Sequence, residues 1–281
     1  MIDVLRALVG GWHAEPVPVL TAAAALLLYD RGSRRQGDML PGRARSRSQA
    51  LCLVAGIGVI LIALLSPLDG LALQLQWVHM AQHVLLLVVA PPLVVLARPW
   101  DLGLAAVGPL LRRPLAATQT ALSTPAGRLA ALLAAVLLFV GVLWLWHIPG
   151  LYDLTLRNGA VHDTEHTAFL AVGLLFWTVA LPGAQPRPSP GLVGRSAVVL
   201  AGMVGSWMLA VYIGYAPTVL FAYSGAGGLT AMADQQIAAG VMWVPGSVPF
   251  VIALVVLVAR WFENAARAVA AEAGLRGEAG V

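Results

Sequence analysis

The sequence predicts an all-α membrane protein, a bundle of seven transmembrane helices with the N-terminus outside and the C-terminus inside. Of its 281 residues, 59% are hydrophobic and 11% are charged, which is far from the usage of soluble domains. Most of the separable apolar stretches reach the about 20 residues that a helix needs to cross a bilayer. They cover residues 17–29, 49–65, 77–97, 128–146, 164–182, 195–215 and 236–258. Because they leave no room for a soluble domain, we expect one integral membrane domain over residues 1–281.

The first apolar stretch is the shortest, and the last is followed by a segment with charged residues. The stretch 17–29 is short enough to be read as a signal peptide, but Glu15 precedes it, an arginine cluster follows it, and no A-x-A-like cleavage site is evident. These flanks favour a retained span. Residues 260–281 alternate alanine with charge, so we expect a solvated helix there that continues the last span into the cytoplasm.

Arginine sets the predicted orientation, because the chain contains no lysine. All of the 17 arginines except Arg6 and Arg157 follow the first, third, fifth or seventh stretch or begin the next one. Positive residues gather on the cytoplasmic side of membrane proteins, so this side is inside. The excess of positive charge therefore indicates topology and contact with anionic lipid, and we expect no nucleic-acid partner.

Five of the six histidines fall at the predicted outer ends of apolar stretches. His79 and His83 begin the third stretch, His147 follows the fourth, and His162 and His166 flank the start of the fifth. Asp234, with Gln235 and Gln236 beside it, precedes the seventh at the same level, whereas His13 has no paired partner. Polar residues at the edge of lipid are costly and usually functional. The alternative is ordinary interfacial histidines that bind headgroups or cap helix ends.

Spacing favours metal binding. Residues at i and i+4 lie on one face of a helix, so each H-x-x-x-H pair can chelate one ion. Gln76 lies on the face of His79 and His83 as an outer partner. Asp163 and Glu165 can orient the rings of the other pair, although Glu165 itself is expected to point away from it, since adjacent helical residues are about 100° apart. Imidazole suits copper, zinc, iron and nickel alike, and the single cysteine, Cys52, excludes a thiolate-rich site.

The residues around these histidines resemble those of the CtaG-type cytochrome c oxidase assembly factors, a multi-span family. The similar stretches are HMAQH at 79–83 with the run through Pro91-Pro92 to Pro99, WHIPGLYD at 146–153, the H-x-x-x-H of 162–166 with FLAVGLLFW after it, and DQQIAAGVMWVPG at 234–246. They occur in order and extend over most of the chain. Ala97 departs from the pattern, where glycine is expected, and no ligand is affected.

This resemblance implies a role in assembling a haem–copper terminal oxidase of the bacterial plasma membrane, by binding copper at the outer face. It implies metal ligation by His79, His83, His147, His162 and His166, with Asp234 as a further ligand or hydrogen-bond partner. Copper is the expected metal, as one or two ions, and zinc is the less favoured one. The expected partners are the lipid bilayer and either terminal oxidase subunits or extracytoplasmic copper carriers. Because five imidazoles exceed the needs of one Cu(I), the layer is expected to hold more than one copper or to pass one between two sub-sites.

Two other functions are compatible with parts of the pattern, whereas the resemblance implies binding rather than catalysis. His162 to His166 fits H-x-x-E-H, a zinc hydrolase motif, but the nearest candidate serine, Ser206, lies in mid-span without a base. A haem-binding electron carrier needs one imidazole from each of two facing helices. Two histidines at i and i+4 on one helix cannot straddle a single macrocycle.

Overall fold

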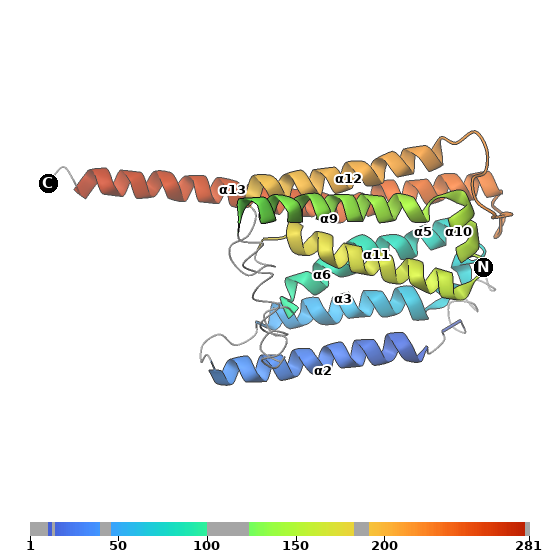
Figure 1. The fold of residues 1–281 in the computed structure, drawn as a ribbon, viewed down its shortest axis with the longest axis horizontal. Helices are drawn as coiled ribbons and strands as arrows, with labels where there is room; N and C mark the ends of the chain where they lie inside the picture. The colour runs from blue at the N-terminus through green and yellow to red at the C-terminus, as the bar shows by residue number, and fades with distance from the viewer. Residues whose placement is uncertain (1–10, 13–14, 40–45, 100–123, 183–190, 279–281) are drawn as a thin grey trace.

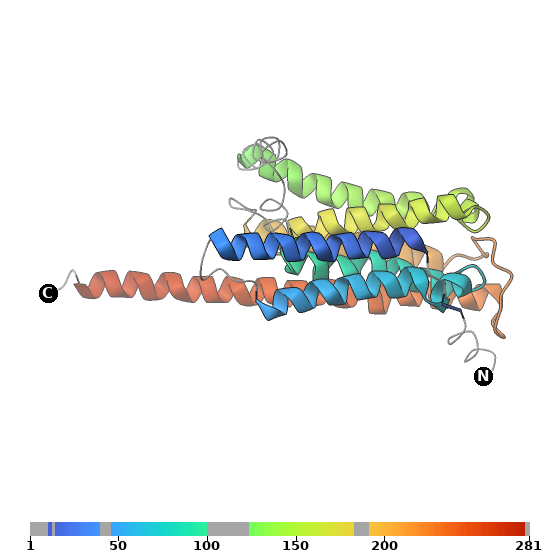
Figure 2. The same cartoon turned by 90° about the horizontal axis from the view of Figure 1, so that it is seen from below.

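The chain folds into an all-helical bundle. The computed structural model describes residues 11–12, 15–39, 46–99, 124–182 and 191–278, and these ranges contain helices and connections but no strand. The long helices lie side by side, and the last of them, α13 (Ala231–Glu278), extends well beyond the others at one end (Figures 1 and 2). His13 lies outside the described residues.

Five helical segments of the described residues are long and apolar enough to cross a membrane: α3 (Arg47–Leu65), the segment Gln76–Leu96, α9 (Pro125–Trp146), α12 (Leu192–Gly214) and α13 over Ala231–Ala270. The chain is therefore a multi-pass membrane protein. The stretches predicted at 17–29 and 164–182 are helical too, in α2 (Pro16–Met39) and α11 (Gly159–Ala180), but both helices are more polar. The count of seven spans and the orientation stay predictions.

The segment Gln76–Leu96 lies at the centre of the bundle. It is built from α5 (Gln76–Val84), the π-helical turn η1 (Leu85–Val89) and α6 (Ala90–Leu96). Of its most apolar window, 61% is buried, against 22–39% for the other four candidate spans. Most of this segment therefore faces protein, and its polar side chains Gln76, His79, Gln82 and His83 are buried.

The π-helical turn follows from two adjacent prolines. Pro91 and Pro92 have no N–H to offer the carbonyls one turn earlier, and the widened turn is closed by Ala90, whose N–H donates to Leu85 O. The indole Nε1 of Trp177 on α11 donates to the freed carbonyl of Leu87 at 3.2 Å. A neighbouring helix thus satisfies a carbonyl freed inside the bundle, where no water is available to do so.

Short elements close the bundle at the end opposite the extension of α13. They are α4 (Pro67–Ala72), α10 (Pro149–Thr155) and the segment 215–230, which Figure 1 shows on the right near the starts of α5, α11 and α13. Side chains hold the segment 215–230 in place. Gln235 accepts from Leu220 N at 2.7 Å and donates to Ile213 O at 3.1 Å, and Asp153 accepts from Ala222 N at 2.8 Å.

Candidate metal centre

Asp234 fixes the start of α5. The N-cap residue of this helix, Leu75, provides no side-chain cap, and the first N–H groups of a helix need partners from elsewhere. Both oxygens of the buried Asp234 carboxylate supply them, accepting from Gln76 N at 2.8 Å and from Trp77 N at 3.0 Å. A carboxylate from α13 thus anchors the turn that carries His79.

His79 and His83 lie one turn apart on α5, as their spacing predicts. Their side chains are buried, and the centroids of their rings are 4.4 Å apart. Both rings face α11, where His162 and His166 are likewise buried, with their ring centroids 4.1 Å apart. The ring of His79 lies 5.0 Å from that of His162, so the two pairs adjoin.

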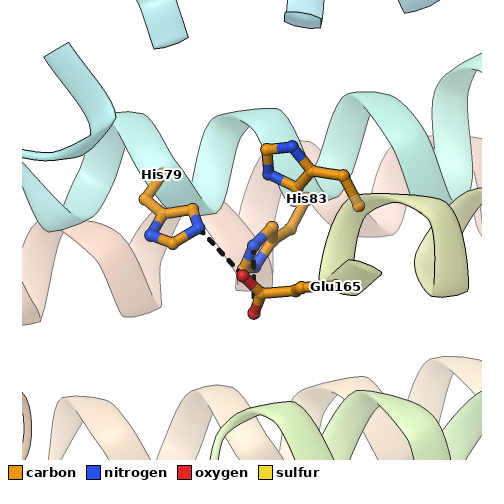
Figure 3. A group of neighbouring side chains, drawn as sticks. His79, His83 and Glu165 are labelled. Atoms are coloured by element: carbon orange, nitrogen blue, oxygen red, sulfur yellow. Dashed lines mark ion pairs between the residues drawn. The ribbon is translucent and has the colours of Figure 1, made fainter. Parts of the chain in front are cut away.

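Glu165 enters the same space from α11. Its carboxylate is fully buried, with Oε2 at 3.3 Å from His79 Nε2 and Oε1 at 3.5 Å from His83 Nε2. Figure 3 shows these three side chains converging from the two helices. Together with His166 they form a group whose ligand atoms all lie within 4.8 Å of one another. We call His79, His83, Glu165 and His166 the four-ligand cluster.

Glu165 was expected to point away from His162 and His166 on its own helix, and the sequence did not predict that it faces His79 and His83 on α5. The angle of about 100° between residues 165 and 166 of α11 is a property of one helix, whereas the centre lies between two. α5 brings His79 and His83 to the side that Glu165 faces. Sequence reasoning assigned Glu165 only the role of orienting a ring, and its signal as a candidate ligand was an acidic residue inside an H-x-x-x-H pair.

A second, overlapping group lies beside the four-ligand cluster. It consists of Asp69 on α4 with His162 and His166 on α11, and its ligand atoms also lie within 4.8 Å of one another. We call these three residues the Asp69 group. Gln82 on α5 donates to Asp69 Oδ1 at 3.1 Å and to Ala63 O at 2.7 Å, which holds α4 against the centre. Nothing in the sequence pattern singled out Asp69 or Gln82.

His147 lies next to His83 but faces a sulfur atom. Its Nδ1 is 2.7 Å from Leu143 O, and a carbonyl can only accept, so Nδ1 carries the proton. The unprotonated Nε2 therefore points at Met80 Sδ, 3.4 Å away. The ring of His147 is 5.6 Å from that of His83, and both His147 and Met80 are buried.

Two tyrosines form a hydrogen-bonding layer behind His79. The hydroxyls of Tyr152 on α10 and Tyr223 in the segment 215–230 each lie 3.0 Å from His79 Nδ1, and that of Tyr223 donates to Ala72 O at 2.8 Å. Burial raises the pKa of both phenols above the usual value, so both keep their protons. These contacts join residues distant in sequence, and no spacing rule would have found them.

Many ligand atoms at the centre have no hydrogen-bond partner among the described residues. The ion-pair contacts of Glu165 lack hydrogen-bond alignment, and the buried atoms left unpartnered are His79 Nε2, His83 Nδ1 and Nε2, His162 Nε2, Glu165 Oε1 and Oε2, and His166 Nε2. Buried polar groups are nearly always paired. Their convergence on one volume is the arrangement expected of ligands around a cation.

Three further polar residues singled out in the sequence belong to neither group of candidate ligands. Gln76 is buried on the His79 face of α5 with both amide atoms unpartnered among the described residues, whereas Gln236 is exposed. The Oγ of Ser206 donates to Gly202 O at 2.9 Å within its own helix. A hydroxyl held in this way is not poised as a nucleophile, so the geometry gives no support to a serine-based hydrolase.

Comparison with known proteins shows which family the chain matches. Residues 26–264 match the sequence model of the family described as cytochrome c oxidase caa3 assembly factor (Caa3_CtaG). The chain is also similar to the uncharacterized protein Mb0105 of Mycobacterium bovis and the uncharacterized protein MT0111 of Mycobacterium tuberculosis, each 27% identical over 195 residues. The match covers 66% of this chain and 29% of each relative, so the chain spans less than a third of their length. No solved structure matches it.

Proposed function

Because this chain belongs to the cytochrome c oxidase caa3 assembly factor family, we propose that it binds copper at the four-ligand cluster and assists formation of a copper centre in a haem–copper terminal oxidase. Copper is cargo in this proposal: it is bound here and passed on. The chain's own residues hold the ion, orient the ligands and exclude water.

The observation that carries the proposal is the convergence of unpartnered ligand atoms on a buried carboxylate. Glu165 is fully buried, and no Lys or Arg pairs with it among the described residues. An isolated buried carboxylate costs several kcal/mol, and a bound cation would offset that cost. Three imidazoles and one carboxylate are donors that divalent copper and zinc both accept.

The contact between His147 and Met80 favours copper over zinc. Thioether sulfur is a soft ligand that prefers Cu(I), whereas zinc sites in proteins use thiolate, imidazole and carboxylate. Met80 Sδ faces the unprotonated Nε2 of His147 beside His83. We infer that His147 and Met80 together offer a softer pair of ligands next to the four-ligand cluster.

The hydroxyls of Tyr152 and Tyr223 lie at Nδ1 of His79, which is compatible with a metal ion at Nε2 on the opposite edge of the ring. The hydroxyl of Tyr223 gives its proton to Ala72 O, so its oxygen is left to accept from His79 Nδ1. A histidine that donates from one nitrogen presents a lone pair on the other, and such an outer partner fixes the ring of a metal ligand. In that tautomer Nε2 of His79, 3.3 Å from Glu165 Oε2, presents a lone pair toward the carboxylate, and a cation is expected between them.

Asp234 acts in this proposal as a hydrogen-bond partner and not as a ligand. Both of its oxygens are engaged by backbone N–H groups of α5, and negative charge at a helix N-terminus is favourable. We infer that Asp234 sets the height of His79 and His83 in the bundle. The arginine distribution supports an orientation with this end of the bundle at the outer face of a bacterial plasma membrane, where it would meet oxidase subunits or copper carriers.

Elemental analysis of the purified protein tests copper binding. Wild type is expected to retain copper after desalting, and the double variant His79→Ala/His83→Ala is expected to lose it. Gln236→Ala, an exposed change on α13, serves as the control and should retain wild-type copper. Full copper in the double variant would overturn the proposed centre.

A cellular assay tests the assembly role separately. Cells that carry only the His79→Ala/His83→Ala variant are expected to accumulate terminal oxidase that is deficient in copper and low in activity. Added copper in the medium should restore part of that activity, because copper at high concentration can reach the oxidase without a carrier. Normal copper content of the oxidase in these cells would contradict the assembly role while leaving metal binding intact.

A further inference from the structure

We propose that the Asp69 group is a transfer sub-site through which a single copper ion reaches and leaves the four-ligand cluster, with His166 as the shared ligand. The inference rests on the proposed copper-binding function and adds a route and a stoichiometry to it. Of the two occupancies expected from the sequence, it favours one copper ion that moves between sub-sites over two ions bound at once.

The two groups overlap at one side chain. His166 belongs to the four-ligand cluster and to the Asp69 group, and in each the ligand atoms lie within 4.8 Å of one another. A neutral imidazole has a single lone pair in the ring plane, because its other nitrogen carries a proton. His166 therefore completes only one group at a time, and one ion shared between two overlapping groups is the simpler occupancy.

The two groups differ in burial, and this difference gives the path of the ion a direction. The exposed fractions are 0% for His79 and Glu165 but 6% for His162, while Asp69 is only half-buried. The Asp69 group is thus the more accessible of the two, on the side of α4 at the end of the bundle. An ion approaching from water would meet a partly hydrated carboxylate before it met the dry cluster.

The unpartnered ring nitrogen of His162 supports the Asp69 group as a binding site and not an accidental cluster. Its Nε2 is buried and has no hydrogen-bond partner among the described residues, and the same holds for Nε2 of His166. The two rings are one turn apart on α11 with centroids at 4.1 Å, and the His162 ring is 5.0 Å from that of His79. A ligand exchange from His162 toward His79 therefore needs a displacement of no more than a few ångström.

Asp69 contributes negative charge where the ion must lose water. Its Oδ1 accepts from Gln82, which also donates to Ala63 O, so the carboxylate is held beside His162 and His166. Carboxylates bind hydrated divalent ions readily, and a stepwise exchange of water for carboxylate and imidazole avoids leaving the ion without ligands. The donor set of the Asp69 group, two imidazoles and a carboxylate, is weaker than that of the four-ligand cluster, so the ion moves inward on loading.

The test measures copper exchange in the purified full chain. Cupric ion is added as its glycine complex to start loading, and excess EDTA is added to start release. The variants are Asp69→Asn, which keeps an oxygen for Gln82, and His162→Gln on a different helix. Asp163→Asn is the matched control, because Asp163 is an exposed carboxylate beside His162 that belongs to neither group.

Wild type is expected to bind one copper per chain. Both variants are expected to slow loading and release together by at least about tenfold, the size of effect usual for a lost partner at a metal site. Stoichiometry and the electron paramagnetic resonance spectrum should stay as in wild type, since the four-ligand cluster is intact. The joint slowing identifies a route, because a lost ligand of the final site would speed release.

Three results would overturn the inference. Rates in both variants equal to those of Asp163→Asn would show that copper does not pass the Asp69 group. Two tightly bound copper ions per wild-type chain would show that the two groups are independent sites and not stages in the transfer of one ion. A wild type that binds no copper would overturn the proposed function as well, which distinguishes that failure from the first two.

Discussion

Glu165 places its Oε2 3.3 Å from Nε2 of His79 in a space where neither side chain is exposed to solvent. The two residues come from different helices, and the contact lacks the alignment of a hydrogen bond. A carboxylate oxygen and a ring nitrogen that both present lone pairs repel at this distance unless a proton or a metal ion lies between them.

Replacing Glu165 with glutamine should separate binding from stability. Glu165→Gln keeps the shape but removes the charge, so we expect copper affinity to fall by at least about tenfold. The unfolding temperature of the copper-free protein should stay equal or rise, because a buried unpaired carboxylate is costly. Competition with a chelator and thermal unfolding in detergent measure the two effects. Asp163→Asn should leave both unchanged, and a less stable copper-free Glu165→Gln protein would contradict the role of the charge as a cation ligand.

Removing the Tyr223 hydroxyl should weaken copper binding without touching a ligand. Tyr223→Phe leaves His79 Nδ1 without the oxygen that Ala72 orients. We expect affinity to fall by about 10–100-fold, as is usual when an outer partner of a ligating histidine is lost. Isothermal titration with copper measures the change. Tyr215→Phe is the control, because Tyr215 is 77% exposed, and equal affinities for the two variants would contradict the orienting role.

Substituting Met80 should change the choice of metal. Met80→Leu keeps an apolar side chain of similar volume, so we expect little effect on folding. Affinity for Cu(I) should fall by at least about tenfold while affinity for Zn(II) stays constant, since only the softer ion uses thioether sulfur. Met203→Leu, on α12 outside the centre, should change neither. A parallel loss of both metals in Met80→Leu would indicate a packing role instead.

Adding a methyl group at position 173 should disturb the centre from a distance. A Cβ on Gly173 would meet Leu87 O at 2.7 Å and Pro91 Cγ at 2.8 Å, so α11 must move away from η1. We expect Gly173→Ala to destabilise the protein by about 1–3 kcal/mol and to lower copper affinity, because α11 carries Glu165 and His166.

The matched control for that variant is Gly141→Ala on α9, where an added Cβ has nothing within 4 Å. It should stabilise the protein by about 0.5–1 kcal/mol, since alanine restricts the unfolded chain and favours the helix. Thermal unfolding and chelator competition measure both proteins. An unaltered Gly173→Ala protein would show that the approach of α11 to the π-helical turn does not position the ligands.

Much of the centre was accessible to pattern reasoning because its rules are local. The i, i+4 spacing of His79 with His83 and of His162 with His166 survives in the fold, since helical geometry fixes it whatever the neighbours are. The carbonyl freed by Pro91 and Pro92 also follows from a local rule, since proline lacks an N–H in any context. The role of Glu165 was missed because it depends on which helix lies opposite.

By itself the sequence determined a helical membrane protein with histidine pairs at matched levels, because apolar length, charge distribution and helical period are properties of a chain read along one dimension. The tertiary structure alone decided which carboxylate joins the histidines. It directs Asp234 to cap α5, turns Glu165 toward His79 and His83, brings Asp69 to His162, and sets two tyrosines behind one ring. These contacts arise where helices distant in sequence meet, and no periodicity within one helix encodes the identity of its neighbour.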